Sequence, residues 1–409
     1  KIYNTRIQVV RGLQSDVLRH VWSLLVAINE ETWEGLLHDN TSPIPRAGRV
    51  THELVAKGIG DVGEVDIPMC VWESTIPPSF AKTAQQGAPR LKPLSTHARE
   101  MFKAMSRANS ALFRVTKSGA PPNSYAFVIP KNSIKCSWIF HMVWLNEQTE
   151  EKPPPFYLPT TEDMAYLMEF YCGAGKGGLW ATHVDISNCY WGFRLPKEFE
   201  EAFRLSLGNL GEGLEGESFA LLRLPFGWKF SPVLCQRALQ FFLKDLKKGQ
   251  TLVLHYLDDF MVLGHDKALV AEVTKALVAI LVEKGCLISP KSKLDPVQEM
   301  QWLGKSFDFK SGKVFNTDGA LSVMLAKWLV LATSFCTRKR VQSAVGKFRW
   351  LARPHEFLSP VMAGLCAHTL WGPKYLPFTP VAILRSLASV LALSFTGWTP
   401  LPAIPSQVR

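Results

Sequence analysis

The sequence predicts an α+β protein, because short β-rich runs and amphipathic helices both occur along it. Residues 252–254 and 260–263 are apolar runs on either side of a tight connection, which predicts a β-hairpin. Turn residues alternate with β-rich runs over residues 117–148, which predicts a small sheet. Residues 15–37 and 337–353 place apolar side chains near helical spacing, which predicts two helices.

The predicted hairpin carries two adjacent carboxylates, Asp258 and Asp259, at its connection. A solvated turn is the ordinary interpretation of such a pair, because Asp forms turns readily. Turns between buried strands usually contain Gly or Asn, and this connection contains neither. Two carboxylates that repel each other become compatible when a divalent cation lies between them. The hairpin therefore predicts half of a metal site.

A third carboxylate, Asp185, lies near the end of another β-rich run, and the aromatic pair Tyr190 and Trp191 follows it. Two-metal phosphoryl transfer requires carboxylates from separate strands, which hold two ions about 3.5 to 4 Å apart. We therefore expect Asp185 and Asp258 to bridge both ions, with Asp259 in a supporting position.

Composition predicts a soluble globular protein of two to four domains, since the chain has 409 residues, 47% hydrophobic and 20% charged. Its eight cysteines form no C-x-x-C pair, which argues against a zinc site or a disulfide framework. A chain without a disulfide framework is expected in a reducing intracellular compartment, the nucleus or the cytoplasm. The longest apolar stretch, residues 381–395, is interrupted by Arg385 and is shorter than the roughly 20 residues of a membrane helix, so we expect a packed helix and no membrane partner. Because the chain begins with Lys1 and not Met, we expect a processed product or a piece of a longer polypeptide.

The net charge of +11 is concentrated near the C-terminal end of the chain. Residues 319–409 contain ten Lys or Arg and one acid, Glu356, which places +9 of the +11 there. A single basic cluster is usually a solvated helix face. A basic surface of this extent mainly attracts a polyanion, so the helix at 337–353 is expected to pack on one face and to contact phosphates on another.

Five segments occur in the order and approximate spacing of the palm motifs of reverse transcriptases. They are HVDISNCYWGF (183–193), LPFGWKFSP (224–232), YLDDF (256–260), GCLISPKSK (285–293) and QWLGK (301–305). Over about residues 120–365 the chain resembles reverse transcriptases, most of all those of LTR-type retrotransposons and the related tyrosine-recombinase retrotransposons.

This resemblance implies the right-hand polymerase architecture, with fingers, an antiparallel palm sheet with helices, and a helical thumb. The implied boundaries are 1–85 for an N-terminal extension of unknown role, 86–160 and 193–232 for the fingers, 161–192 and 233–312 for the palm, 313–370 for the thumb, and 371–409 for a C-terminal segment.

The resemblance also implies extension of a DNA primer on an RNA template with deoxynucleotides. Asp185, Asp258 and Asp259, with Ile186, resemble the ligands of two Mg²⁺ ions, for which Mn²⁺ is a substitute. Lys293, with Lys291 as second choice, resembles the lysine that protonates the pyrophosphate leaving group.

Other residues resemble the family's substrate contacts. Tyr190 occupies the place of the aromatic gate that excludes a ribose 2′-hydroxyl. In the loop at 224–232, Gly227 lets the backbone approach a nucleotide and Ser231 is the expected cap of the next helix. The implied nucleotide contacts are Lys131, Lys135, Tyr190, Phe226, Gly227, Lys291 and Lys293. The implied primer and template contacts, which include the RNA–DNA hybrid, are Tyr256, Gln301, Trp302, Leu303, Gly304, Arg338, Lys339, Arg340, Lys347 and Arg349.

One position departs from the family pattern, since Ser137 stands where a fingers Arg that binds the triphosphate is expected. Lys135 is a substitute with a point charge in place of the guanidinium fork. The final forty residues contain no recognisable RNase H sequence, so we expect hybrid degradation to need another chain, such as a separate RNase H, or a part of the polypeptide outside this sequence. Two alternatives stay open: a reverse-transcriptase fold retained as a nucleic-acid-binding or assembly component, and a telomerase-like or primase-like polymerase. The oligomeric state is open.

Overall fold

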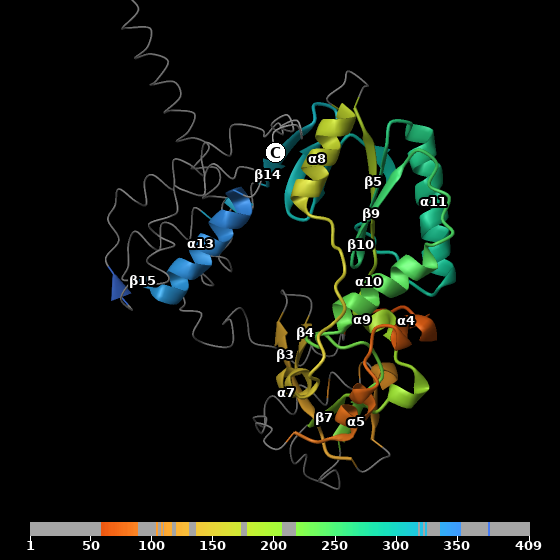
Figure 1. The fold of residues 1–409 in the computed structure, drawn as a ribbon. Helices are drawn as coiled ribbons and strands as arrows, with labels where there is room; N and C mark the ends of the chain where they lie inside the picture. Colours follow the sequence, from red (N-terminus) through yellow and green to blue (C-terminus); the bar gives the residue numbers. More distant parts are fainter. Residues whose placement is uncertain are drawn as a thin grey trace, which may run out of the picture. The chain divides into compact units, whose positions relative to one another are not determined.

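The computed structural model describes residues 59–88, 110–116, 120–130, 136–172, 178–206, 218–317, 336–352 and 375–376, with single positions at 104, 108, 320, 321 and 324 (Figure 1). The chain divides into two compact units. One comprises residues 48–159 and 180–296, and the other residues 1–47, 160–179 and 297–409. Within the described ranges, no helix has the length and apolar character needed to cross a membrane. The predicted helices at 15–37 and 381–395 lie outside the described residues.

The first unit contains a four-stranded sheet in the order β11-β5-β10-β9. Its strands are β5 (Trp180–Asp185), β9 (Leu252–Tyr256), β10 (Asp259–Gly264) and β11 (Lys293–Val297). The predicted hairpin is confirmed as the antiparallel pair β9 and β10. Residues 260–263 are buried as predicted, but residues 252–254 are only half-buried, because β9 is an edge strand.

Helix α11 (Lys267–Glu283) packs against β5 and β10 and places its apolar side chains in the core. Its N-cap is Asp266, whose carboxylate accepts from the backbone N–H groups of Ala268 and Leu269. Figure 1 shows this long helix beside the sheet. The helix α10 (Ser231–Phe242) contributes seven buried residues to the same core.

A five-stranded sheet in the order β2-β8-β7-β3-β4 forms another part of the first unit. Its strands are β2 (Phe113–Val115), β3 (Ser124–Pro130), β4 (Cys136–His141), β7 (Arg204–Ser206) and β8 (Ser218–Leu221). The small sheet expected at 117–148 is confirmed by the β3–β4 hairpin. The end of that stretch is instead the helix α7 (Val143–Gln148), in which Leu145 is fully buried.

Short elements complete the first unit. Strand β1 (Val65–Asp66) pairs in parallel with β6 (Phe193–Arg194). The remaining elements are α4 (Met69–Glu73), α5 (Ser79–Gln85), α9 (Cys189–Gly192) and the 3-10 turns η1 (Ser110–Leu112) and η2 (Lys197–Phe199).

The second unit contains the three-stranded antiparallel sheet β12-β13-β14. Its elements are α8 (Thr161–Cys172), β12 (Glu299–Trp302), β13 (Lys305–Asp308), β14 (Lys313–Asn316), α13 (Arg338–Ala352) and the pair β15 (Cys336–Thr337) and β16 (Tyr375–Leu376). The predicted basic helix is confirmed as α13, and its apolar positions Val345, Phe348 and Leu351 are buried as expected.

Candidate active site

The β5–β10 ladder brings the three predicted aspartates together. Asp185 is the last residue of β5 and lies directly opposite Asp259, the first residue of β10. Asp259 in turn pairs with Tyr256, so the connection of the hairpin consists of Leu257 and Asp258. The sequence predicted Asp258 and Asp259 in that connection, and the prediction is wrong for Asp259. The ladder extends one residue further than predicted because Asp259 pairs with neighbours on both sides.

The two-residue connection adopts a backbone that its sequence does not favour. Leu257 has a φ of 53°, in the left-handed region where Gly or Asn is usual. Gln236 of α10 holds this turn with both ends of its buried side chain: Nε2 donates to the His255 carbonyl at 2.9 Å, and Oε1 accepts from the Leu257 N–H at 2.8 Å. The ring of His255 stacks on Phe260 at 4.2 Å between centroids. These tertiary contacts offset the backbone strain and fix the position of Asp258.

The three carboxylates create a site of concentrated negative charge. Burial, together with the charges of Asp259 and Asp185, raises the pKa of Asp258 to about 6, while His183 acts in the opposite direction. His183 Nε2 lies 2.9 Å from Asp259 Oδ1. The backbone around Asp185 is fixed by Ser292, whose Oγ accepts from the Asp185 N–H at 3.0 Å.

This donor set fits a hard divalent cation that substrate oxygens help to hold. Within the described part of the chain, no three His, Cys, Asp or Glu side chains form a cluster that holds a metal ion by itself. Mg²⁺ is usually bound by one or two carboxylates together with substrate phosphates and waters. Because Asp259 is engaged by His183, Asp185 and Asp258 are the carboxylates best placed as direct ligands.

The ring of Tyr190 lies near the carboxylates and is in contact with a second aromatic ring. Tyr190, on α9, is half-buried and its ring centroid lies 4.7 Å from that of Phe226. Burial raises the pKa of the Tyr190 phenol, and the charge of Asp258 also raises it, so the ring is near that carboxylate and stays neutral. Phe226 is 40% exposed and therefore offers a free apolar surface.

The loop before α10 has the glycine geometry that the sequence predicts. Gly227 has a φ of 86°, and a Cβ there would lie 3.1 Å from the Phe140 carbonyl oxygen. Asn146 fastens the loop, because its Nδ2 donates to the Gly227 carbonyl and its Oδ1 accepts from the Lys229 N–H. Ser231 was expected to cap α10, and this is wrong: its hydroxyl donates to the Pro225 carbonyl at 2.6 Å, and α10 has no side-chain cap.

Several predicted nucleotide contacts are only partly placed. Lys291 and Lys293 are exposed in the segment that enters β11, next to the strand of Asp185. Lys131 and Lys135 lie outside the described residues. Ser137 lies on β4, where it pairs with Ile129.

Comparison with known proteins assigns this region. Residues 134–307 match the family model "Reverse transcriptase (RNA-dependent DNA polymerase)". This part of the chain is a reverse transcriptase domain. The Gag-Pol polyprotein of feline leukemia virus is 30% identical over 149 residues, 36% of this chain and 8% of that protein. The Gag-Pro-Pol polyprotein of Mason-Pfizer monkey virus is 22% identical over 330 residues, 78% of this chain and 16% of that protein.

Solved structures of reverse transcriptases superpose on this chain and have the same fold. A foamy viral protease-reverse transcriptase in complex with RNA/DNA hybrid superposes with a TM-score of 0.59 at 18% identity, over 93% of this chain and 46% of that one. A second foamy viral structure, in complex with double-stranded DNA, has a TM-score of 0.57 at 19% identity, over 92% and 59% of the two chains. The likeness confirms the predicted α+β polymerase fold, while the predicted domain boundaries stay predictions.

The QWLGK segment of the domain forms the turn between β12 and β13. Leu303 and Gly304 adopt φ angles of 46° and 73°, and a Cβ on Gly304 would lie 2.8 Å from the Trp350 ring. The buried Lys305 donates to the carbonyls of Trp350 and Leu351 at 3.1 Å each, so it satisfies the C-terminal end of α13.

The primer contacts predicted from this hairpin and from α13 stay predictions. Trp302 is 3% exposed, so contacts with a primer there depend on the backbone and on the exposed Gln301. On α13, Arg349 is exposed and the Lys347 ammonium lies 4.4 Å from the Trp350 ring centroid. The side chains of Arg338, Lys339 and Arg340 lie outside the described residues.

Three positioning residues were missed in the sequence: His183, Gln236 and Asn146. For His183 a signal exists, since it stands two residues before Asp185 on a strand and therefore lies on the same face. For Gln236 the signal is weaker, a single amide in an otherwise apolar helical stretch. Asn146 belongs to a Leu-Asn pair that fits the fingers pattern of the family, but its positioning role shows no local signal, because its partners are more than eighty residues away.

Proposed function

We propose that this chain is an RNA-directed DNA polymerase that extends a DNA primer with deoxynucleotides by two-metal-ion phosphoryl transfer. The observation that carries the proposal is the meeting of Asp185, Asp258 and Asp259 at one end of the β5–β10 ladder inside a reverse transcriptase domain. The chain spans only a small share of the polyproteins it matches, so the activity belongs to this proposal.

The side chains of the site suggest which part of the polymerase reaction each of them serves. Asp185 and Asp258 would hold Mg²⁺, or Mn²⁺ as a substitute, and the bound ions would stabilise the attacking and leaving oxygens. Tyr190 and Phe226 form an apolar surface near Asp258, and the incoming sugar packs against it. Lys291 and Lys293 supply positive charge for the triphosphate and a proton for pyrophosphate. The template is RNA and the product is an RNA–DNA hybrid, which a separate RNase H or a part of the polypeptide outside this sequence would degrade.

The retroviral relatives favour an origin in a retroelement, and we propose the LTR or tyrosine-recombinase retrotransposon type within that group. We also propose an intracellular reducing compartment, with which the free thiols of Cys70, Cys189, Cys235 and Cys286 are compatible. A non-catalytic, nucleic-acid-binding role is the second candidate, because Ser137 stands where a triphosphate-binding Arg is expected.

Primer extension by the purified chain on RNA and DNA templates, with Mg²⁺ or Mn²⁺, tests the proposal. Asp185→Asn and Asp258→Asn each remove a charged ligand at nearly constant volume, so extension should fall at least about a hundredfold. Asp245→Asn, at an exposed carboxylate outside the site, is the matched control and should extend normally. Undiminished extension by either variant contradicts the metal assignment, and a wild-type chain that binds primer–template without extending it supports the second candidate.

A further inference from the structure

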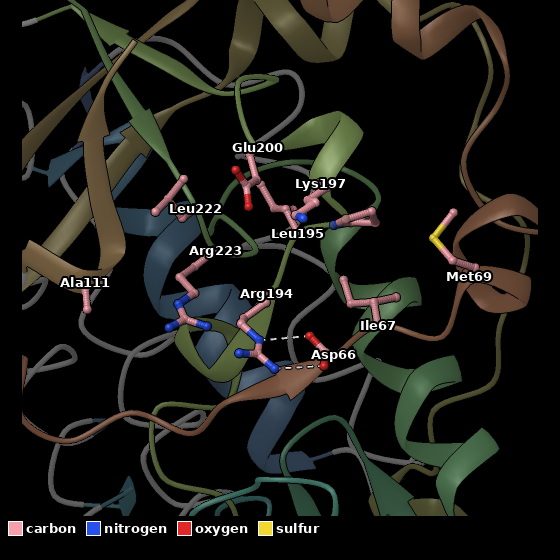
Figure 2. A pocket seen from close by; sticks show the side chains of 11 residues that line it. Asp66, Ile67, Met69, Ala111, Arg194, Leu195, Lys197, Glu200, Leu222 and Arg223 are labelled. Carbon is pink, nitrogen blue, oxygen red and sulfur yellow. Dashed lines mark hydrogen bonds and ion pairs between the residues drawn. The ribbon is translucent and has the colours of Figure 1, made fainter. Parts of the chain in front are cut away.

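A pocket of about 420 Å³ lies in the first unit, between β1, β6 and the segment that follows β8. It uses no residue of the acidic site. Figure 2 shows the charged side chains that line it: Asp66, Arg194, Lys197, Glu200 and Arg223. The rest of the lining is mainly apolar, and the volume is in the range of small-molecule sites, roughly 300–1,000 Å³.

Arg223 is an unusual residue for such a wall. It is 4% exposed, and its Nε and Nη1 atoms are buried without a hydrogen-bond partner among the described residues. A buried donor that lacks an acceptor costs free energy, and the cost is larger for a charged group. Burial also lowers the pKa of this guanidinium, although the group remains charged at any physiological pH.

The backbone places a second guanidinium directly opposite Arg223. Arg194 and Arg223 form an antiparallel bridge, flanked by hydrogen bonds from the Leu195 N–H to the Leu222 carbonyl and from the Leu224 N–H to the Phe193 carbonyl. This pattern is that of a non-hydrogen-bonded pair, in which opposite side chains approach most closely. Two like charges at such a position destabilise the pairing unless negative charge compensates them.

The acids of the pocket compensate only one of the two guanidinium groups. Arg194 binds both oxygens of Asp66 at 2.8 Å, and Glu64 adds a longer contact at 3.4 Å. Glu200 is bound to Arg114 at 2.6 Å. Among the described residues, Arg223 and the exposed Lys197 have no carboxylate within ion-pair distance, although Glu64 and Asp66 attract Arg223 from further away.

We propose that this pocket binds a small organic anion, whose carboxylate or phosphate group contacts Arg223 and Lys197 and whose apolar body contacts Ile67, Leu195 and Leu222. An anion against the guanidinium would supply the negative charge that Arg223 lacks and would offset its repulsion from Arg194. The bidentate geometry of a guanidinium suits either group equally. This site is independent of primer extension.

Titration of the full chain with sodium benzoate and with phenyl phosphate, followed by ligand-observed NMR in the absence of nucleic acid, tests the proposal. Each probe should bind saturably at one site, and the tighter of the two identifies the preferred group. Inorganic phosphate should bind more weakly than phenyl phosphate, because it lacks the apolar body. If neither aromatic probe saturates the protein up to about 10 mM, the proposal is overturned, because the binding free energy would then be too small for a specific site.

Two variants and a control locate the site. Arg223→Met keeps an unbranched apolar stem but is shorter and carries no charge. Replacing a buried charge by an apolar side chain is commonly tolerated by the fold, and this variant should weaken binding at least tenfold. Lys197→Met changes an exposed side chain and should weaken binding severalfold, so it decides the matter if Arg223→Met fails to fold. Lys275→Met, at an exposed position of α11, should bind as the wild type does. Unchanged affinity in Lys197→Met and in a folded Arg223→Met, or an equal loss in Lys275→Met, contradicts the assignment.

Discussion

His183 and Asp259 show how single residues complete the acidic site. The three aspartates are identifiable in the sequence because two adjacent acids between apolar strands, and a third at the end of another strand, have few structural uses. The bond from His183 to Asp259 joins positions 76 residues apart, so only the strand register determines it. The prediction from the sequence that Asp185 and Asp258 are the direct metal ligands, with Asp259 supporting, therefore gains an argument from the fold.

Tyr190 is predicted to set the choice of sugar. Its half-buried ring lies against Phe226 and near Asp258, where a ribose 2′-hydroxyl would meet it. Tyr190→Ala should lower the discrimination against ribonucleotides, expressed as a ratio of kcat/KM values, by about tenfold or more. Tyr166→Ala changes a tyrosine that is 61% exposed on α8 and should leave the ratio unchanged. An unchanged ratio in Tyr190→Ala would place the gate at another residue.

His255 is predicted to make stability depend on pH. Burial lowers its pKa from 6.5 to about 4, so the unfolded ring takes up a proton as the pH falls below 6.5 while the folded ring stays neutral. Its contribution is therefore complete above pH 6.5 and is lost by about 1.4 kcal/mol per unit as the pH falls towards 4. His255→Phe, which keeps an aromatic ring over Phe260, should lose about 2 kcal/mol less than the wild type between about pH 7 and about pH 5.

Denaturant unfolding of both chains at the two pH values measures this difference. The raised pKa of Asp258 acts in the opposite direction, since its folded carboxyl binds a proton before the unfolded one does. That contribution is common to both chains and cancels in the comparison. Parallel stability curves for the two chains would show that His255 titrates as an exposed histidine does.

At the scale of elements, side-chain amides fasten the two loops of the site to rigid supports. Gln236 connects α10 to the turn between β9 and β10, and Asn146 connects α7 to the glycine loop that precedes α10. Each amide satisfies one backbone donor and one backbone acceptor that would otherwise be unpaired. The turn at Leu257 therefore holds its geometry without the Gly or Asn that its backbone would favour.

Gln236→Met is predicted to displace the hairpin. The substitution keeps the volume of a residue that is 1% exposed but leaves the His255 carbonyl and the Leu257 N–H without partners, at about 1–3 kcal/mol for each group. Without that support the turn at Leu257 should relax and Asp258 should shift, so extension should slow while primer–template affinity remains. Gln240→Met, at an exposed position of the same helix, is the matched control for stability and rate. Equal kcat values in the two variants would show that Gln236 has no positioning role.

These elements show where sequence-based prediction succeeds and where it stops. The β9–β10 hairpin, the β3–β4 hairpin and α13 follow from local periodicity, and all three are confirmed. The cap assigned to Ser231 is wrong because its hydroxyl bonds to Pro225, a contact made by the loop geometry that Gly227 permits. The conformation of Leu257 and the role of Gln236 depend on packing between α10 and the hairpin, which local patterns do not encode.

At the scale of the whole molecule, charge divides the chain into an almost neutral part and a basic part. Residues 319–409 carry +9 of the net +11. Within this stretch, α13 uses Val345, Phe348 and Leu351 for packing, and the Lys305 ammonium satisfies the end of the helix. The described packing face of α13 is therefore apolar, and contact of its basic side chains with a polyanion stays a prediction.

The last prediction is that Arg338, Lys339 and Arg340, at the start of α13, contact phosphates of the primer–template duplex. Replacing all three with Ala should weaken binding alike for every sequence, because phosphates carry charge but no base identity. If each side chain neutralises one phosphate, the slope of log K against log salt should become shallower by roughly 0.9 per lost contact on B-form DNA, with the same sign on a hybrid. Replacing Lys244, Lys247 and Lys248 with Ala removes the same charge from an exposed segment and is the matched control. Binding measured at several salt concentrations separates three explanations. If the basic residues form a solvated helix face, the salt plots of both triple variants will superimpose on that of the wild type, and if net charge alone attracts the duplex, both plots will shift equally. Only phosphate contacts by α13 would flatten the plot of the Arg338, Lys339 and Arg340 variant alone.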